Sequence, residues 1–290
     1  MVEELSIEQI DVRLSCQIFS VSRSGYYGWF NRPQSARKLD NIRLADKIKA
    51  HWENSRKTYG RRRIKASLEK DNEFVGKNRI DKLMRENNLN GAGKKKFKPM
   101  TTTSNHKLEV APRRFKIEES DLVLLAPNKV WGGDITYIDT NEGWLYLSVV
   151  IDLFTKKVVG HSMDEKMPTG LVVNSLEMAI KRQILINKED LIFHSDRGSQ
   201  YAANSFKNLI DKNQIKQSMS RKGNCYDNAM VETFFKTLKV ELGYKKFKTR
   251  EEGKRAIFEY IEVWYNRQRL HSSIDYMSPE LYESKFKLAA

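Results

Sequence analysis

The sequence predicts an α/β protein in which a mixed sheet flanked by helices follows a small all-α segment. Apolar residues recur at helical spacing through the first ninety residues, and β-rich runs begin near residue 128. After residue 169, helix-period and strand-period segments alternate, which is typical of the α/β class. The expected domains are an N-terminal helical segment (1–35), a helix-turn-helix-like DNA-binding domain (36–92), a basic linker (93–127), an α/β core (128–245) and a basic C-terminal helical tail (246–290).

The N-terminal half favours short helices. Residues 7–30 predict the end of one helix, a turn and a second helix, and Arg32-Pro33 then breaks the pattern. Between residues 40 and 89, apolar spacing predicts three helices, with breaks at Tyr59-Gly60 and at residues 72–77. Three short basic helices fit a helix-turn-helix arrangement, and a generic three-helix bundle with a solvated basic face is the alternative.

The C-terminal half begins with three β-rich runs, residues 129–138, 144–152 and 156–163, which predict an antiparallel meander. These runs are followed by a helix over 169–183, a strand at 191–193, a helix over 204–212, a strand at 215–219 and a helix over 228–243. Three antiparallel strands followed by α-β-α-β-α is the element order of a ribonuclease-H-like domain.

The charge is uneven along the chain. The net charge is +15. Residues 32–100 hold 21 Lys and Arg against 8 Asp and Glu, and residues 197–290 hold 18 against 11, whereas residues 120–196 hold 7 against 11. Two basic regions around an acidic one predict a polyanion held on either side of a cation site, although lysine-rich surfaces are also common in proteins that bind no polyanion.

Other classes of protein are disfavoured. The sequence contains no apolar run long enough for a membrane span and no secretory pattern at its start. Cys16 and Cys225 fit neither a metal site nor a disulfide framework, so we expect a cytoplasmic protein.

Three acidic residues lie where phosphodiester chemistry would need them. Asp134 lies within the first strand, Asp196 directly follows the apolar strand at 191–193, and Glu232 lies early in the last core helix, off its apolar stripe. Oxygen ligands suit Mg²⁺, and two divalent ions can stabilise both the attacking and the leaving oxygen of an in-line displacement. The three carboxylates therefore predict a metal-dependent site that cuts and rejoins DNA strands.

These residues and their neighbours resemble the insertion-sequence transposases of the IS-three group. Asp134, Asp196 and Glu232 resemble the DDE triad of that group, with 35 residues between the last two, a spacing shared with retroviral integrases. The words that carry the resemblance are HSDRGSQY (194–201), GNCYDNAMVETFFKTLK (223–239), YNRQRLHSSI (265–274), the Ser278-Pro279-Glu280 run and TYGRRRI (58–64), together with residues 21–29.

The resemblance implies the retroviral integrase catalytic core fold and two Mg²⁺ or Mn²⁺ ions per active site, with Asp134 and Asp196 bridging the metals and Glu232 completing one site. It further implies action on the terminal inverted repeats and target DNA of a mobile element, with a freed 3′-hydroxyl attacking another phosphodiester, often through a circular intermediate. It implies a homo-oligomer on DNA, a first-reading-frame partner or frameshift fusion, and a bacterial, nucleoid-associated protein. Gly133 departs from the Thr common in the group, and we expect that difference to be tolerated because this side chain is not a ligand.

Several side chains are expected to contact DNA. Lys239 matches a basic DNA-contacting position of the group, and Lys236 lies on the same helix face as Glu232. The full expected set is Arg61, Arg62, Arg63, Lys77, Arg79, Lys94, Lys95, Lys96, Tyr226, Asn228, Lys236, Lys239, Arg267 and Arg269. Tyr201 is a further candidate. His194 is expected to support the acids by hydrogen bonding, and a metal ligand or a base is the alternative. His271 is either a phosphate contact or a simple surface residue.

Two other functions compete with an active transposase. One is a catalytically silent DNA-binding regulator of transposition, which the intact acidic triad disfavours. The other is a nonspecific nuclease of the same fold, which the basic regions on both flanks disfavour.

Overall fold

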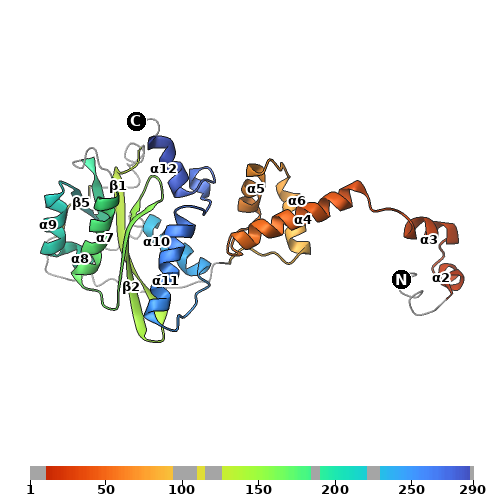
Figure 1. Cartoon of the computed structure of the whole chain (residues 1–290), viewed down its shortest axis with the longest axis horizontal. Coiled ribbons are helices and arrows are strands. Elements are labelled where there is room, and N and C mark those ends of the chain that lie inside the picture. The colour runs from red at the N-terminus through yellow and green to blue at the C-terminus, as the bar shows by residue number, and fades with distance from the viewer. Residues whose placement is uncertain (1–10, 94–109, 115–125, 184–189, 221–228, 288–290) are drawn as a thin grey trace.

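The computed structural model describes residues 11–93, 110–114, 126–183, 190–220 and 229–287. Lys94, Lys95 and Lys96 of the expected linker lie outside the described residues, as do Tyr226 and Asn228. In Figure 1 the described parts form an α/β body, a helical bundle beside it and a helical pair beyond the bundle.

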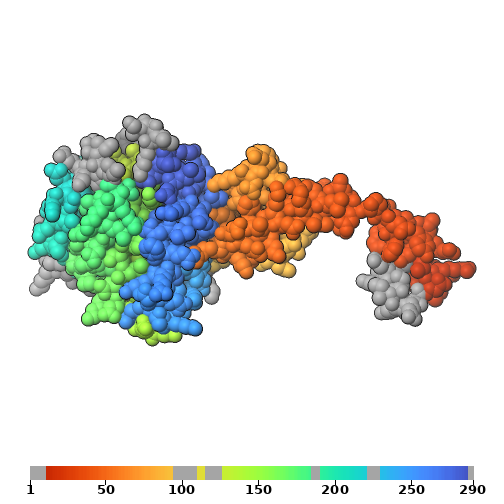
Figure 2. Space-filling model, in the orientation of Figure 1, coloured from red at the N-terminus to blue at the C-terminus, as the bar shows by residue number. Residues whose placement is uncertain are grey.

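The N-terminal half is helical, as predicted. The helical pair is α2 (Val12–Ile18) and α3 (Arg23–Phe30), and the bundle consists of α4 (Ala36–Asn54), α5 (Arg61–Lys70) and α6 (Lys77–Glu86). The Ser35 side chain accepts a hydrogen bond from the Lys38 backbone N–H and caps α4. Fully buried Leu44, Ile64 and Ile80, one from each bundle helix, lie in the core. The space-filling view shows that the bundle adjoins the α/β body, whereas the pair projects away from it (Figure 2).

A five-stranded mixed sheet organises the body. Its strands are β1 (Val130–Thr140), β2 (Gly143–Asp152), β3 (Val158–Asp164), β4 (Ile192–Ser195) and β5 (Lys216–Met219). The spatial order is β3-β2-β1-β4-β5. The first three strands pair antiparallel, and β4 and β5 add in parallel on the β1 side. This order and these directions are those predicted for a ribonuclease-H-like domain, so the predicted fold class is confirmed.

Helices cover both faces of the sheet (Figure 1). One face packs on α7 (Thr169–Arg182), on the short α8 (Ser199–Ala202), which the sequence did not predict, and on α9 (Asn204–Lys212). The other face packs on α10 (Ala229–Glu241), α11 (Arg250–Glu259) and the π-helical turn η3 (Tyr260–Tyr265). Trp131 belongs to the first core and Val130 to the second, because successive strand side chains point to opposite faces.

The C-terminal segment packs against the body. After η3 come the 3-10 turn η4 (Ser272–Ile274) and α12 (Pro279–Lys287). The Asn266 side chain accepts a hydrogen bond from the Val158 N–H at 2.9 Å and donates one to the Val158 carbonyl at 3.0 Å, so it completes the backbone pairing of β3. Lys157 and Glu283 form an ion pair of 2.7 Å between the sheet and α12.

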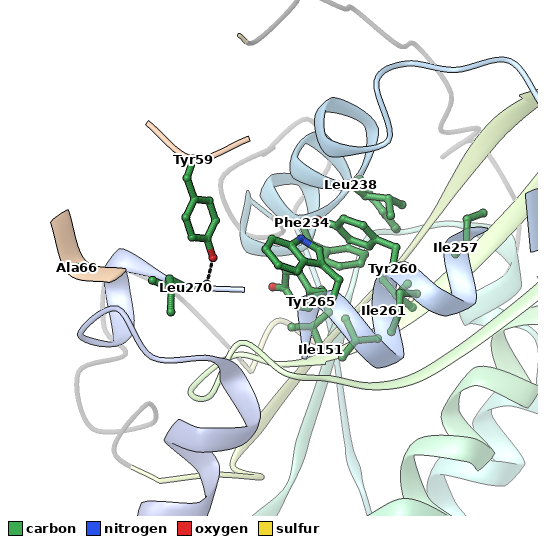
Figure 3. Close-up of a cluster of buried hydrophobic side chains, with 14 of the residues drawn as sticks. Tyr59, Ala66, Ile151, Phe234, Leu238, Ile257, Tyr260, Ile261, Tyr265 and Leu270 are labelled. Atoms are coloured by element: carbon green, nitrogen blue, oxygen red, sulfur yellow. Dashed lines mark hydrogen bonds between the residues drawn. The ribbon is translucent and has the colours of Figure 1, made fainter. Parts of the chain in front are cut away.

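The bundle and the C-terminal segment meet at Tyr59. The Tyr59 hydroxyl accepts a hydrogen bond from the Leu270 N–H at 2.6 Å, and the Tyr59 ring lies 5.8 Å from that of Trp264 (Figure 3). Arg56 lies 5.7 Å from the centre of the Tyr260 ring. Tyr59 lies in the TYGRRRI motif and Leu270 in the YNRQRLHSSI motif. These two motifs therefore meet at the contact between the bundle and the C-terminal segment, which we call the joint.

Within the described ranges, none of the helices combines the length and the apolar character needed to cross a bilayer.

His271 lies in this joint beside the positive charge of Arg269. Its surroundings predict that the stability of the fold depends on pH. Burial and the Arg269 guanidinium, at 3.2 Å from Nε2, lower the pKa of His271 to about 2. The folded protein therefore keeps this imidazole neutral, while the unfolded chain protonates it near the ordinary value of 6.5. Stability should be lost as pH falls below that value, by about 1–2 kcal/mol at pH 5.

Urea unfolding of the wild type and of His271→Gln at pH 7 and pH 5 measures the effect. The wild type should lose more stability than the variant between the two pH values, because glutamine does not titrate. Equal losses in the two proteins would contradict the neutral, buried imidazole.

Candidate metal-dependent nucleic-acid site

The register of β1 and β4 brings two of the predicted acids together. The last paired residues of these parallel strands are Gly132 and His194. Asp134 and Asp196 each lie two residues further along their chains, on the same face, and adjacent strands are about 4.8 Å apart. The two carboxylates therefore project side by side from the face that packs on α10.

Asp134 is partly buried, and its ionised form is disfavoured. Its Oδ1 accepts a hydrogen bond from the Ile135 N–H at 2.8 Å. Burial raises the pKa of this carboxyl well above its ordinary value, the negative charge of Asp196 raises it further, and Glu232 adds a smaller increase. The three acids are thus electrostatically coupled, with Asp196 acting on Asp134 more strongly than Glu232 does.

Asp196 begins the turn after β4. Its Oδ1 accepts a hydrogen bond from the Gly198 N–H at 2.9 Å, which fixes the carboxylate at the end of the strand. His194, two residues before, is fully buried, and its Nδ1 lies 3.0 Å from the Ser218 Oγ on β5. The contact joins β4 to β5, and the supporting role of His194 toward the acids stays a prediction.

Glu232 comes from α10 and points away from that helix's buried stripe. Val231, Phe234 and Leu238 are buried, whereas the Glu232 side chain is 38% exposed and lies 3.4 Å from Lys236 Nζ. The described part of this helix begins at Ala229, directly after residues 221–228, which lie outside the description.

Two glycines allow the three acid-bearing elements to approach one another. A Cβ on Gly132 would come within 2.8 Å of the Val231 side chain on α10, and a Cβ on Gly133 would overlap the ring of buried Phe193 on β4. The pair just before Asp134 thus lets β1 lie close to the helix that carries Glu232 and to the strand that precedes Asp196. The Gly-Gly pair is the signal in the sequence for this close approach.

The arrangement is suited to cations, although it is not a closed cage. Among the described residues, no three His, Cys, Asp or Glu side chains are close enough to hold one metal ion together. The donors are all carboxylate oxygens, which Mg²⁺ and Mn²⁺ prefer, and the repulsion between Asp134 and Asp196 is relieved when a divalent cation lies between them. The residues therefore fit a metal pair in which Asp134 and Asp196 supply the core.

Some of the predicted DNA contacts lie on the surface. Arg61, Arg62 and Lys77 are exposed on the bundle, and Lys236 and Arg267 are exposed on the body. Two of these arginines already form ion pairs with acidic side chains: Arg61 lies 3.5 Å from Asp81, and Arg267 lies 3.4 Å from Glu280.

Lys239 and Arg63 lie against aromatic rings. The Lys239 Nζ lies 4.7 Å from the centre of the Tyr137 ring, and burial lowers the pKa of this lysine. The Arg63 guanidinium lies 5.4 Å from the centre of the Tyr59 ring, and burial lowers its pKa also.

Three expectations for DNA contact are corrected by burial or pairing. Arg269 has a side chain only 5% exposed and pairs with Glu241 at 2.8 Å, so it holds the fold together. Arg79 donates to Asp40 at 2.7 Å and to Asn41 at 2.6 Å, and so braces α6 against α4. Tyr201 is 2% exposed and packs against Phe206 in the core on the α7 face.

Known proteins resemble this chain along most of its length. Family models described as "Integrase core domain" match residues 125–225 and 232–286, and one described as "HTH-like domain" matches residues 38–97.

An uncharacterized 31 kDa protein of insertion element IS600 from Shigella sonnei is 43% identical over 93% of this chain and 98% of its own. The transposase InsF of insertion sequence IS3A from Escherichia coli is 35% identical over 96% of this chain and 95% of its own. Among solved structures, the HTLV-2 integrase catalytic core domain in complex with magnesium matches 55% of this chain and 98% of its own, with 17% identity and a TM-score of 0.41.

A substitution at Gly133 tests how closely β1 and β4 pack beside the site. Gly133→Thr, the residue common in the group, should destabilise the protein by about 1–3 kcal/mol because the added atoms meet Phe193. The glycine that departs from the group's usual Thr is thus the residue that fits the space beside Phe193 in this chain. Adding Phe193→Leu should recover part of the loss, with a favourable coupling of about 1 kcal/mol in urea unfolding.

Gly170→Ala on α7 is the matched control, since a Cβ there meets nothing within 4 Å. It should leave stability unchanged or slightly increased. Strict additivity of Gly133→Thr and Phe193→Leu would exclude direct contact between the two positions.

Proposed function

This chain belongs to the transposases of IS3-type insertion sequences, and from that premise we propose how it acts on DNA. It cleaves a strand at the terminal inverted repeats of its element, and the freed 3′-hydroxyl then attacks a second phosphodiester. Asp134, Asp196 and Glu232 are the catalytic carboxylates, and they hold two Mg²⁺ or Mn²⁺ ions.

The coupling of Asp134 and Asp196 carries this proposal. The negative charge of Asp196 raises the pKa of buried Asp134, and two carboxylates placed this way at adjacent parallel strands are an unfavourable arrangement unless a cation joins them. A divalent ion pair, when bound, activates the attacking oxygen and stabilises the leaving one. In this proposal Asp134 and Asp196 are the residues that would hold both ions.

Glu232 completes one ion's ligands in the proposed complex. Its present partner Lys236 lies 3.4 Å away and is itself 69% exposed, so this pair is weak and easily exchanged. As Glu232 turns toward the ions, Lys236 becomes available for a phosphate oxygen one turn along the helix. Lys239 lies on the same helix face and is proposed to contact DNA near the cut.

The bundle and the body together bind the element end in this proposal. Exposed Arg61, Arg62 and Lys77 on the bundle and Arg267 on the body supply phosphate contacts, and Lys94, Lys95, Lys96, Tyr226 and Asn228 remain proposed contacts. Joining two element ends in one reaction requires two end-binding units, which supports a homo-oligomer on DNA. A first-reading-frame partner or fusion would add recognition of the repeat, and the usual product would be a circular intermediate.

Substitution of Asp196 tests the chemistry. Asp196→Asn should abolish nicked and joined products, a loss of more than about 1,000-fold, because the ions lose a bridging ligand. Purified protein would be incubated with Mn²⁺ and a labelled duplex that carries the element's inverted repeat, and the products would be mapped on denaturing gels.

Asp190→Asn is the control, since Asp190 is an exposed aspartate near the start of β4 that pairs with Lys129 at the surface. It should cleave as the wild type does, and both variants should retain the duplex. Cleavage that persists in Asp196→Asn would reject the catalytic assignment, and a wild type that binds without any metal-dependent product would favour the silent regulator.

The salt dependence of binding tests the bundle surface. Lys77→Gln and Arg62→Gln should each weaken binding and reduce the slope of log K against log salt by about 1, because each removes one phosphate contact. Lys82→Gln is the matched control, since this lysine is on the same helix as Lys77 and already lies 3.7 Å from Glu86. Fluorescence anisotropy between low and moderate salt measures the slopes, and unchanged slopes for both test variants would remove this surface from the proposed interface.

A further inference from the structure

A buried polar cluster closes the far end of the helix that carries Glu232. The last residue of α10 is Glu241, whose carboxylate accepts hydrogen bonds from Tyr260 Oη at 3.0 Å and Trp264 Nε1 at 3.0 Å. Arg269 adds Nε at 2.9 Å and Nη2 at 2.8 Å to Oε1. The side chains of Glu241 and Arg269 are only 3% and 5% exposed, and all three donor residues come from the C-terminal segment.

The cluster and Glu232 lie at opposite ends of α10. Glu241 lies nine positions after Glu232, which corresponds to about 13–14 Å along the helix axis and to opposite sides of the helix. Between them, the ring of Phe234 meets that of Tyr265 edge-on at 4.7 Å (Figure 3). The C-terminal segment therefore contacts α10 at its middle and at its end, on the sides away from Glu232.

Apolar rings alone would keep α10 and the C-terminal segment together, but they would still let the helix rotate and slide by small amounts. A guanidinium with two donors on one carboxylate has a fixed direction, and so it sets the rotation and axial position of α10. A buried ion pair usually gives no more stability than an apolar pair of the same shape. The presence of this pair is therefore better explained by orientation than by stability.

We propose that Glu241 is a positioning residue of the strand-transfer reaction: held by Arg269, Trp264 and Tyr260, it fixes α10 so that Glu232 reaches the metal pair. This inference rests on the proposed function of Glu232. It also assigns a role to the YNRQRLHSSI motif, because the buried Arg269 of this motif orients α10.

The test compares two buried glutamates in the full-length chain. Glu241→Gln keeps the shape of the side chain but removes its charge, and should raise the dissociation constant for Mn²⁺ in calorimetric titration by about 10- to 100-fold. Strand cleavage at fixed Mn²⁺ should fall by a similar factor, while retention of the inverted-repeat duplex stays unchanged.

Glu283→Gln is the matched control, because Glu283 is another buried glutamate of the C-terminal segment, paired with Lys157 on the sheet and not with α10. It should lower the melting temperature but leave Mn²⁺ binding unchanged. Equal weakening of Mn²⁺ binding by both variants would overturn the inference, because loss of stability would then explain both.

A double variant separates orientation from stability. Glu241→Gln with Arg269→Met removes both charges, so no unpaired guanidinium stays buried and the melting temperature should recover toward the wild-type value. Mn²⁺ binding and cleavage should stay weak in this variant, because no directed contact holds α10. Recovery of both along with the melting temperature would show that the cluster acts only through stability.

The two proposals can fail separately. If the wild type cleaves with Mn²⁺ and Asp196→Asn does not, but Glu241→Gln binds Mn²⁺ normally, only the positioning role of Glu241 is rejected. If the wild type neither binds Mn²⁺ nor cleaves, the proposed function is rejected and the inference falls with it.

Discussion

The repulsion between Asp134 and Asp196 is the constraint around which the rest of the body is built. Both carboxylates follow a parallel strand pair whose hydrogen bonds end at Gly132 and His194, so the backbone cannot separate them. Burial strengthens the repulsion by removing the water that would screen it. In the proposed function a divalent cation relieves this repulsion when it binds, and the surrounding sheet keeps the two charges together until then.

That rigidity comes from close packing on both faces of β1. Gly132 and Gly133 let α10 and Phe193 approach the strand more closely than any residue with a Cβ would permit. The C-terminal segment continues the same packing from the other side of α10, and through Leu270 it reaches Tyr59 of the bundle. The residues that approach DNA in the proposal and those that hold metal are thus parts of one continuous packed structure.

The basic residues of the chain divide between two tasks. A net charge of +15 suggests a broad nucleic-acid surface, but several cations hold elements together instead. Arg269 anchors Glu241, Arg79 braces α6 on α4, and Lys157 ties the sheet to α12. The surface available for phosphates is therefore smaller than the count of Lys and Arg implies, and it is concentrated in exposed positions such as Lys77 and Lys236.

The order and type of most elements were determined by the sequence alone, because period-2 and period-3.6 apolar patterns are local properties that a folded core must satisfy. The four-residue helix α8 is too short to show such a pattern. The three acids were also proposed from the sequence alone, since their residue types and the motifs around them are typical of metal-dependent phosphodiester chemistry. Only the tertiary structure decided which charged side chains face solvent: Arg269 and Arg267 are two residues apart in one motif, yet one is buried and the other exposed. Burial depends on contacts between residues far apart in sequence, as between Glu241 and Arg269 or Gly133 and Phe193, and no local pattern encodes those pairings.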